Sequence, residues 1–470
     1  RRHHRKSQIF AGDNKNLLKR FFEGIEYNNA STIPCLFCIN MQFSLDYFAC
    51  LCKNAIKVYQ ESVMKNSKVI DRYLSSIAFS EEFGRQMRFI TGPRQAGKTT
   101  MAKSVLTGNK ETYYFNWDEK TTKDLYRNNP AFLSAAAAGK GKPWICFDEI
   151  HKMPKWKNIL KGLFDGYEER LSFIVTGSAK LDTFRKSGDS LAGRYFVFTL
   201  NPVISSELAG MPLKDIMPEP DGASYVEKII SREKSAAEAV DAIIEHTGFP
   251  EPLLKSSGAF SRKWHDSYFE RIIKEDMRDL TMIRHLEKVA DLIYLLPARV
   301  GSPLSVNALR EDLEMNFHTI SSYISGLSVS YALFNLPPFT GNMKRLVKKE
   351  RKFYLYDFDE IKNEGARFEN FCALELKSRV DLWNDSGADR FALNYLRTKD
   401  GKETDFLIVK NNRPYVLFES KISDTPIEPH HRSAAAALGG IPFVQIIRKP
   451  KTLRAEGSGI FSVSADRLFA

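Results

Sequence analysis

The sequence predicts a multidomain α/β protein, and three observations support this prediction. The chain has 470 residues, enough for roughly two to four domains at about 100–200 residues each. Short apolar runs that suit buried strands alternate with helical patterns in its first half. A hairpin pattern between residues 390 and 421 predicts a second sheet in its last quarter.

Composition is that of an ordinary soluble protein and suggests an anionic partner. Hydrophobic residues make up 43% and charged residues 27% of the chain, which argues against wholesale disorder. Lys and Arg number 69 against 57 Asp and Glu, so the net charge is +12. An excess of this size favours nucleic acid or a phosphorylated ligand, without choosing between them.

No membrane span, secretory signal or disulfide framework is expected. No uninterrupted apolar run approaches the roughly 18 residues that a membrane span needs, and the basic N-terminus lacks the apolar core and cleavage site of a signal. Six cysteines in a chain of this length do not suggest a disulfide framework. We therefore expect a cytoplasmic protein without a membrane partner.

Residues 1–63 are interpreted as an N-terminal extension, non-native or poorly ordered. They show no sustained helical or strand period and hold four of the six cysteines, in the pairs Cys35–Cys38 and Cys50–Cys52. Four thiolates can close a zinc site, but the second pair is one residue short of a C-x-x-C knuckle. An apolar helical or loosely ordered segment is therefore the favoured alternative. We expect the extension to be dispensable to the core fold.

A phosphate-binding loop is the strongest motif in the sequence. The strand-like run Met87–Thr91 precedes a GxxxxGK[ST] motif, and a helix is predicted from Thr100 to Leu106. The flanking strand and helix disfavour the alternative of a plain glycine turn. In such a loop, glycines let backbone N–H groups point at phosphate oxygens, the lysine reaches the β- and γ-phosphates, and the threonine hydroxyl binds Mg²⁺. The predicted ATP-binding residues are Gly92, Pro93, Arg94, Gln95, Ala96, Gly97, Lys98, Thr99, Thr100 and, from a later strand end, Ser178.

Two carboxylates at the end of the next apolar run complete the predicted site. The run Trp144–Phe147 is continuously apolar, as expected of a strand buried on both faces, and Asp148 and Glu149 follow it. The carboxyl end of a parallel strand lies beside the phosphate loop. We assign Asp148, with Thr99, to Mg²⁺, and Glu149 to polarising the attacking water. A solvated acidic pair is the alternative.

Two later strand ends offer residues that can act on the γ-phosphate. Ser172–Thr176 is a predicted strand, and Thr176 or Ser178 can sense the γ-phosphate or cap the next helix. Arg194 precedes a predicted strand from Tyr195 to Leu200. Its guanidinium can neutralise transition-state charge, in its own chain or across a homo-oligomer interface, or it can form a structural salt bridge.

These segments resemble the prokaryotic AAA-type ATPases that carry a C-terminal domain of unknown function. The resemblance covers about Lys65 to the C-terminus. It implies a P-loop NTPase core of the AAA type, a helical lid, a winged helix and a terminal α/β domain like the restriction endonucleases. Besides the phosphate loop, the resemblance rests on Trp144–Lys152, Thr176–Ser178, Ser190–Arg194, His246–Glu251 and Tyr268–Leu280.

The predicted domain boundaries follow from composition and from this resemblance. A Pro-rich stretch from Met211 to Pro220, followed by Gly222, marks the end of the ATPase core, and apolar spacing predicts that Tyr225–Leu296 is mainly helical. The prediction is a P-loop ATPase core at 64–221, a helical lid at 222–296, a winged helix at 297–360 and a PD-(D/E)xK-like domain at 361–470.

The segment after the lid is predicted to be a winged helix-turn-helix. Ser305 can cap a helix that ends near Leu313, and Phe317–Leu327 forms a second helix. Two strands, Tyr331–Leu336 and Arg351–Phe358, flank a basic loop at 344–349. On DNA the loop would contact phosphates, but the second helix has no Arg or Lys, so docking to a protein partner is an open alternative. Its groove-facing residues would be His318, Ser321, Ser322 and Ser325.

The C-terminal hairpin places two carboxylates opposite each other. Strands 404–409 and 415–421 are joined by a turn that we centre on Asn412. Like charges across a ladder lie about 5 Å apart and destabilise the sheet unless a cation joins them. The opposed pairs expected from this register are Val409 with Tyr415, Leu407 with Leu417, and Asp405 with Glu419.

A second metal site is predicted on the same face. Lys421 projects from the same face as Glu419, and Glu369 lies at the edge of the apolar stripe of a predicted helix, Glu364–Arg379. These residues, with Asp405, resemble the PD-(D/E)xK nuclease constellation, which implies that the acids bind Mg²⁺ and that the lysine positions the nucleophile.

Two features leave other interpretations of this hairpin open. Ser420 stands where the family has an aliphatic residue, and Glu403, opposite Lys421, can form an ion pair with it. A salt-bridged structural hairpin and a domain that binds without cutting are therefore alternatives.

The expected function is Mg²⁺-dependent ATP binding and hydrolysis by an ATPase that acts on DNA or another nucleic acid, with metal-dependent strand cleavage. The alternative is a nucleotide-switched ATPase that docks a protein partner and whose nuclease-like domain is inactive.

Overall fold

The computed structural model describes residues 69–106, 113–129, 131–139, 141–177, 191–277, 286–340, 351–398 and 400–470. Ile70–Ala470 forms one compact unit. The predictions for residues 1–63 and their four cysteines, for Ser178 and for the basic loop at 344–349 lie outside the described residues. None of the helices in the described ranges has the length and hydrophobicity of a membrane span.

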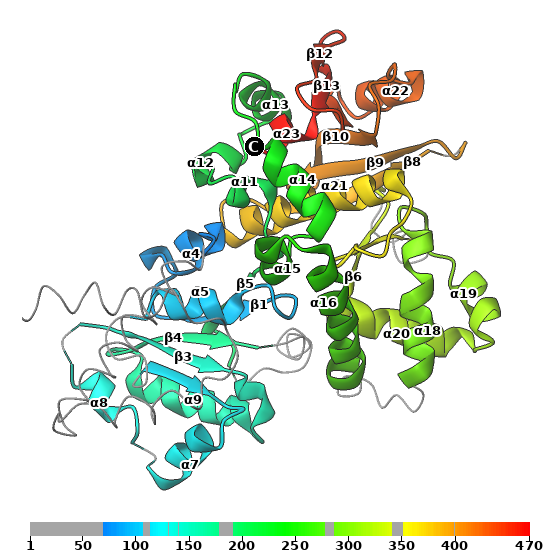
Figure 1. Ribbon diagram of the computed structural model, residues 1–470. Helices are drawn as coiled ribbons and strands as arrows, with labels where there is room; N and C mark the ends of the chain where they lie inside the picture. The colour runs from blue at the N-terminus through cyan, green and yellow to red at the C-terminus, as the bar shows by residue number, and fades with distance from the viewer. Residues whose placement is uncertain are drawn as a thin grey trace, which may run out of the picture. The chain divides into compact units, whose positions relative to one another are not determined.

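The first half of the described chain is built on a five-stranded sheet in the order β2-β3-β4-β1-β5, with every pair parallel (Figure 1). Between the third and fourth strands along the chain, helix α9 (Trp156–Tyr167) makes the crossover that parallel strands need. The strands are β1 (Met87–Thr91), β2 (Tyr114–Asn116), β3 (Trp144–Asp148), β4 (Ser172–Thr176) and β5 (Tyr195–Thr199). All but β2, which the sequence did not predict, have bounds close to the predicted ones.

Helices cover both faces of this sheet, which is why its central strands are buried on both faces. Helices α8 (Ser134–Ala137) and α9 (Trp156–Tyr167) pack on the face that carries Phe89 and Phe147. The other face carries Ile90 and packs against α4 (Tyr73–Ala78) and α5 (Lys98–Ser104). Neighbouring residues of one strand thus enter different cores, because side chains alternate along a strand.

A mainly helical segment follows, as predicted. Its longest described helix, α16 (Gly258–Arg271), continues directly into a π-helix, η4 (Ile272–Met277). π-Helical turns are rare in proteins, and those that occur often lie at functional sites. The other helices are α11 (Ser205–Leu208), α12 (Leu213–Ile216), α13 (Gly222–Ile230), α14 (Ala237–His246), α15 (Pro250–Lys255) and α18 (Leu286–Leu295).

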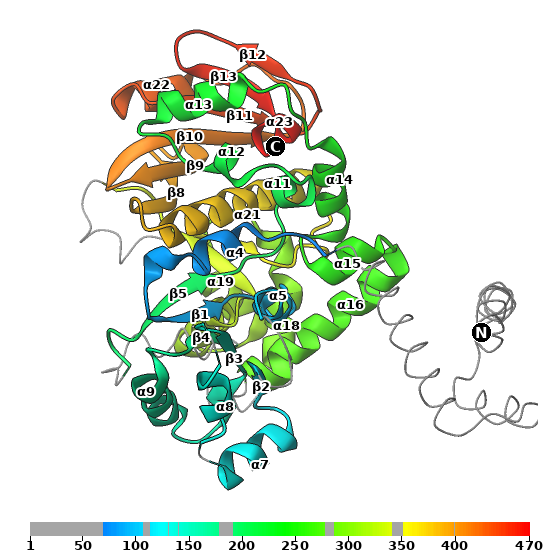
Figure 2. The same ribbon diagram turned by 90° about the vertical axis from the view of Figure 1, so that its left-hand side faces the viewer.

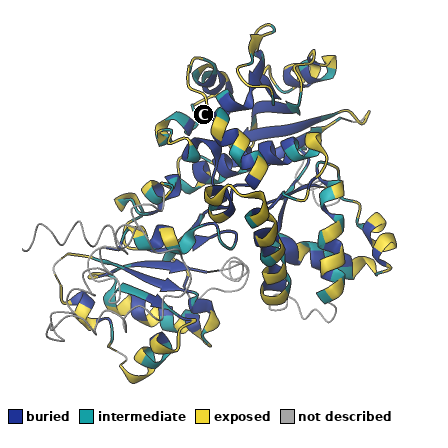
Figure 3. Cartoon of the chain, in the orientation of Figure 1, coloured by how far each residue is buried: buried dark blue, intermediate teal, exposed yellow. Residues whose placement is uncertain are grey.

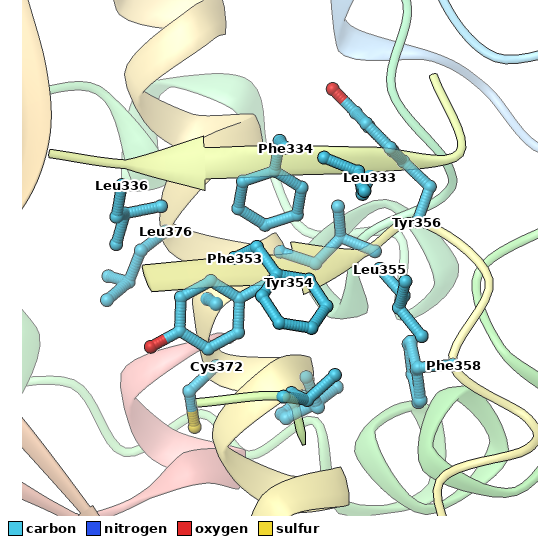
Figure 4. Close-up of a cluster of buried hydrophobic side chains, with 14 of the residues drawn as sticks. Leu333, Phe334, Leu336, Phe353, Tyr354, Leu355, Tyr356, Phe358, Cys372 and Leu376 are labelled. Atoms are coloured by element: carbon cyan, nitrogen blue, oxygen red, sulfur yellow. The ribbon is translucent and has the colours of Figure 1, made fainter. Parts of the chain in front are cut away.

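Two capped helices and a hairpin form the next part. Ser305 accepts a hydrogen bond from the Ala308 N–H and caps α19 (Val306–Leu313), and Asn316 caps α20 (Phe317–Val329) in the same way. The strands β6 (Leu333–Leu336) and β7 (Lys352–Leu355) pair antiparallel. Figure 4 shows the aromatic side chains of this hairpin packed against the helix that follows it.

The C-terminal part is a six-stranded mixed sheet in the order β12-β13-β11-β10-β9-β8. Its long helix, α21 (Glu364–Asp385), runs past the predicted end at Arg379 because its apolar stripe continues through Leu382 and Trp383. The remaining elements are β8 (Phe391–Arg397), β9 (Glu403–Lys410), β10 (Arg413–Lys421), α22 (Pro429–Ala437), β11 (Phe443–Ile447), β12 (Leu453–Ala455), β13 (Ile460–Ser464) and α23 (Ala465–Leu468).

The hairpin register is right near the predicted site and wrong near the turn. Leu407 pairs with Leu417, as predicted, but Val409 pairs with Pro414 rather than Tyr415. The turn has two residues with positive φ, and a bulge between Pro414 and Val416 adds one residue to β10. The bulge shifts the pairing by one position, which restores the predicted register beyond it.

Buried residues concentrate in the two large sheets and on the inner sides of the helices (Figure 3). The view in Figure 2 shows α21 between the six-stranded sheet and α4. Contacts of α21 with α4, β5, β8 and β10 place this helix between the two sheets.

Candidate nucleotide-binding site

The loop between β1 and α5 has the backbone that a phosphate cradle needs. Gly92 and Gly97 have φ angles of 130° and 99°, which favour glycine. A Cβ atom on Gly92 would lie 2.2 Å from the carbonyl oxygen of Leu200, so no larger residue fits there. Because α5 begins at Lys98, the amide groups of its first turn are directed toward the loop.

Lys98 folds back over the loop. Its Nζ donates hydrogen bonds to the carbonyl oxygens of Gly92 at 2.9 Å and Pro93 at 2.6 Å. Burial lowers the pKa of Lys98 to about 8, although the charge of Glu149 opposes this shift. A bound phosphate would add negative charge next to this ammonium and would favour its charged form.

Asp148 accepts hydrogen bonds from three hydroxyl groups. Its Oδ2 accepts from Thr99 Oγ1 at 2.8 Å and from the Tyr114 hydroxyl at 2.6 Å. Its Oδ1 accepts from Thr176 Oγ1, a residue paired with Asp148 across β3 and β4. These bonds hold the carboxylate next to the phosphate loop and orient both of its oxygens.

This oxygen arrangement fits Mg²⁺. Magnesium in nucleotide sites is commonly held by one or two carboxylates, a hydroxyl, waters and the substrate phosphates. Thr99 and Asp148 would hold it here, because their oxygens already meet at the loop. Sequence reasoning missed Tyr114, which comes from the short edge strand β2, and saw no role for Thr176 in orienting Asp148.

Glu149 lies beside this carboxylate on a strained turn. Its φ of 57° is left-handed, and its N–H donates to the carbonyl oxygen of Thr176 at 3.1 Å. Lys152 Nζ lies 3.4 Å from its Oε2. Burial raises the pKa of the Glu149 carboxyl, which makes this group a stronger base than an exposed glutamate.

The structure places Arg194 away from the phosphate loop of its own chain. Strand β5 runs parallel to β1, and its first residue pairs with Met87 at the start of β1. Arg194 comes directly before β5 and so lies at the end of the sheet where β1 begins. The phosphate loop follows β1 and lies at the opposite end. Its guanidinium pairs with Asp165 on α9, at 2.7 and 3.0 Å. Arg194 thus forms the salt bridge that was the alternative, and a role in neutralising transition-state charge, in its own chain or on a neighbouring subunit, stays a prediction.

The four residues of the second predicted site do come together. Asp405 and Glu419 are adjacent across the hairpin, where the Asp405 N–H donates to Glu419 Oε2 at 3.1 Å. Lys421 Nζ donates to Glu419 Oε1 at 2.9 Å. Ser420 donates to Asp405 Oδ2 from its backbone N–H and its hydroxyl. Burial raises the pKa of Glu369 to about 7 and that of Glu419 to about 8, and Asp405 adds to both shifts.

Lys352 supplies the cation that these carboxylates need. Its ammonium lies 3.3 Å from Asp405, 3.4 Å from Glu403 and 3.5 Å from Glu369, and the residue is only 3% exposed. Within the described ranges, no three His, Cys, Asp or Glu side chains are arranged to hold a metal ion. These carboxylates thus lie in an ion-pair cluster around Lys352, and the metal site expected from Glu369, Asp405 and Glu419 stays a prediction.

Two details of this cluster differ from the sequence-based expectation. Glu403 pairs with Lys352 and Arg397 rather than with Lys421. In the sequence, Lys352 stands out only as a lysine at the start of the apolar run of β7. Its partners come from α21 and β9, and the sequence alone does not show that these elements meet β7.

The second helix of the predicted winged helix-turn-helix presents a polar face. His318, Ser322 and Ser325 are exposed and Ser321 is half-buried. Ile320 and Leu327 of the same helix are fully buried. The face that would meet a partner is therefore accessible within this chain, and none of these four residues is Asp, Glu, Lys or Arg.

Family models match three parts of the chain. Residues 84–209 match an AAA domain. Residues 237–358 and 364–447 each match a domain of unknown function (DUF8612 and DUF4143). The first match supports an AAA-type ATPase core around the loop and Asp148, and the other two describe no activity.

Related proteins are themselves uncharacterized. The chain is 25% identical over 359 residues to uncharacterized proteins of Mycobacterium tuberculosis and Mycobacterium bovis, covering 74% of this chain and 73% of each relative. A DNA polymerase III gamma subunit-related protein of Thermotoga maritima is 14% identical with a TM-score of 0.25, over 55% of this chain and 97% of that one. PCH-2 of C. elegans is 12% identical with a TM-score of 0.21, over 54% and 65%. At these TM-scores the structural likeness carries no argument about function.

Proposed function

We propose that the protein binds and hydrolyses ATP, with Mg²⁺, at the loop between β1 and α5. The observation that carries this proposal is the contact between Thr99 and Asp148 at the carboxyl ends of the strands of a parallel sheet. It brings a phosphate cradle and a fixed carboxylate to one place, which is the arrangement that phosphoryl transfer needs. The AAA domain match over the same residues supports it.

Each residue has a definite task in this proposal. Lys98 leaves the loop carbonyls and neutralises charge on the β- and γ-phosphates. Thr99 and Asp148 hold Mg²⁺, which offsets phosphate charge when bound. Glu149, with its raised pKa, accepts a hydrogen bond from the attacking water and favours its attack on the γ-phosphate.

Two variants test this proposal. Lys98→Ala should abolish ATP turnover and weaken nucleotide binding, because the phosphate charge loses its buried partner. Glu149→Gln should abolish turnover but keep binding, because the amide preserves shape and cannot act as a base. Turnover is measured by phosphate release and binding by calorimetry, with Lys120→Ala on the exposed start of α7 (Lys120–Asn128) as control. If the unaltered, well-folded protein takes up neither ATP nor ADP with Mg²⁺, the proposal is wrong.

For the C-terminal half, we infer a domain that binds a partner without cutting nucleic acid. The observation in favour is the ammonium of Lys352 among the carboxylates that a nuclease would use for its metal. We propose that the partner is a protein and that nucleotide state alters its docking, because the exposed face of α20 carries no Arg or Lys for phosphate contacts. Nucleic acid is the second candidate partner, favoured by the net charge of +12.

Salt dependence separates the two partners. Binding to DNA through several phosphate contacts weakens steeply as salt rises, so DNA affinity is measured between about 50 and 200 mM salt. Steep loss of tight binding would favour nucleic acid, and absence of binding at low salt would favour a protein. Cleavage of any DNA or RNA with Mg²⁺ or Mn²⁺, lost in Glu419→Ala, would overturn the inference of a domain that does not cut.

A further inference from the structure

We propose that Arg94 is a phosphate-binding side chain of the nucleotide site, and that Asp276 is a positioning residue that holds Arg94 while no nucleotide is bound. The proposal rests on the proposed ATP site and adds to it a contact from the helical segment. Arg94 belongs to the phosphate loop, and Asp276 belongs to the π-helix η4 at the end of α16.

Arg94 and Asp276 form a bidentate contact, which we call the fork. Arg94 Nε lies 2.6 Å from Asp276 Oδ2, and Arg94 Nη2 lies 2.8 Å from Asp276 Oδ1. Its third nitrogen, Nη1, lies 2.8 Å from Glu275 Oε2. All three guanidinium nitrogens are therefore occupied by carboxylates. The side chain of Asp276 is 4% exposed and that of Glu275 is 50% exposed, so Asp276 is the stronger partner.

This fork lies within electrostatic reach of the phosphate-binding residues. The charges of Asp276 and Arg94 both act on the pKa of Lys98, and the charge of Glu149 acts on that of Arg94. A nucleotide that enters the loop thus brings its phosphate charge close to a buried carboxylate that repels it.

Arginine is the side chain best suited to exchange one anion for the other. Its planar guanidinium forms the same two-pronged contact with a phosphate as with a carboxylate. When phosphate is bound, Arg94 gains a second anionic partner, and the phosphate charge repels the carboxylate of Asp276. The exchange frees η4 from the loop, and η4 is continuous with α16. Nucleotide binding is thereby linked to the helical segment.

A structural brace is the competing explanation, and the two predict opposite results. If Asp276 only braces the loop, its loss weakens nucleotide binding. If it competes with phosphate for Arg94, its loss strengthens binding. The test is calorimetric titration of the full chain with MgADP and with a non-hydrolysable ATP analogue.

Asp276→Asn should bind both nucleotides about tenfold more tightly than the unaltered protein, the size of one charged hydrogen bond. Arg94→Gln should bind about tenfold more weakly. The gain in affinity from Asp276→Asn should shrink in the Arg94→Gln background, because Asp276 acts mainly by holding Arg94. Glu270→Gln removes one negative charge from an exposed position on the same helix and should leave affinity unchanged.

Glu275→Gln gives an independent result if Asp276→Asn fails to fold. It removes the exposed carboxylate that lies 2.8 Å from Arg94 Nη1, so it should tighten nucleotide binding, but by less than Asp276→Asn. Weaker binding by a folded Asp276→Asn or Glu275→Gln protein overturns the proposal. An unaltered protein that binds no nucleotide would instead contradict the ATP site itself.

Discussion

The carboxylate of Asp148 is held in one orientation by its hydrogen bonds. An isolated carboxylate at a strand end can adopt several rotamers, but this one accepts bonds from Thr99, Tyr114 and Thr176. Each hydrogen bond to a charged group contributes about 1.5–3 kcal/mol. Tyr114 is the partner that the motif does not contain, and Lys103 lies over its ring, 3.9 Å from the centroid.

Tyr114→Phe should raise the Mg²⁺ concentration that ATP turnover requires. Without the hydroxyl, one oxygen of Asp148 loses a bond of 2.6 Å and the carboxylate is held less firmly. We expect about tenfold more Mg²⁺ to be needed for half-maximal turnover, the equivalent of about 1.4 kcal/mol. Mg²⁺ titration of phosphate release measures this, and nucleotide binding in the presence of a chelator should be unchanged. The neighbouring Tyr113→Phe serves as control; equal Mg²⁺ requirements in both variants would exclude the role.

At the scale of elements, β7 connects the hairpin of the predicted winged helix to the C-terminal sheet. Its first residue, Lys352, reaches carboxylates from α21 and β9, while Phe353 and Tyr354 pack in the core shown in Figure 4. Two opposed acids on neighbouring strands would repel each other. The packing of β7 therefore supplies both apolar contacts and the compensating charge.

Lys352→Met should destabilise the protein by about 3–5 kcal/mol at pH 8, because buried carboxylates lose their cation. The loss should shrink toward pH 5. The pKa of Glu369 is already raised to about 7, so this group binds more protons in the folded than in the unfolded state. Its contribution to stability is therefore fully present below the unfolded pKa and is lost as pH rises through 7.

Urea unfolding at both pH values measures this difference. Lys362→Met, at a side chain that is 79% exposed, is the matched control and should change stability little. An equal loss for Lys352→Met at pH 5 and pH 8 would show that lost packing, rather than unpaired charge, is the cause.

At the scale of the whole molecule, the phosphate loop is anchored by segments far from it in the chain. Arg72 donates to the carbonyl oxygens of Ala96 at 2.8 Å and Asn201 at 2.6 Å. Asn201 in turn donates to Asp381 of α21, and the Thr199 N–H donates to Asp385 of the same helix. The loop is thus held by α21 on one side and, through Arg94, by η4 on the other.

Removing residues 1–63 should leave a soluble protein with the ATP turnover of the full chain. Ile70–Ala470 forms one compact unit, and the contacts that anchor the loop all lie within it. A chain of residues 64–470 is compared with the full chain by gel filtration and phosphate release. An insoluble or inactive product would show that the extension belongs to the core fold. The other predicted boundaries, at 221, 296 and 360, remain predictions.

Much of the local structure could be predicted because neighbouring residues determine it. The strands β1, β3 and β4 follow from continuous apolar runs. The start of α19 follows from Ser305. The glycines at 92 and 97 predict a loop whose φ angles favour glycine. The bulge in β10 was not predicted, although Pro414 marks its place, because proline has no N–H to donate inside a central strand.

What the sequence by itself determined is therefore the phosphate loop, the order of the elements and the meeting of Asp405 with Glu419. Only the tertiary structure decided what each charged group faces: Tyr114 on Asp148, Asp276 on Arg94, and Lys352 among the acids of the C-terminal sheet. These partners are 34, 182 and 53 residues apart. A charged side chain is stabilised by whatever lies within a few ångströms of it, and packing of distant elements, rather than local sequence, decides which residue that is.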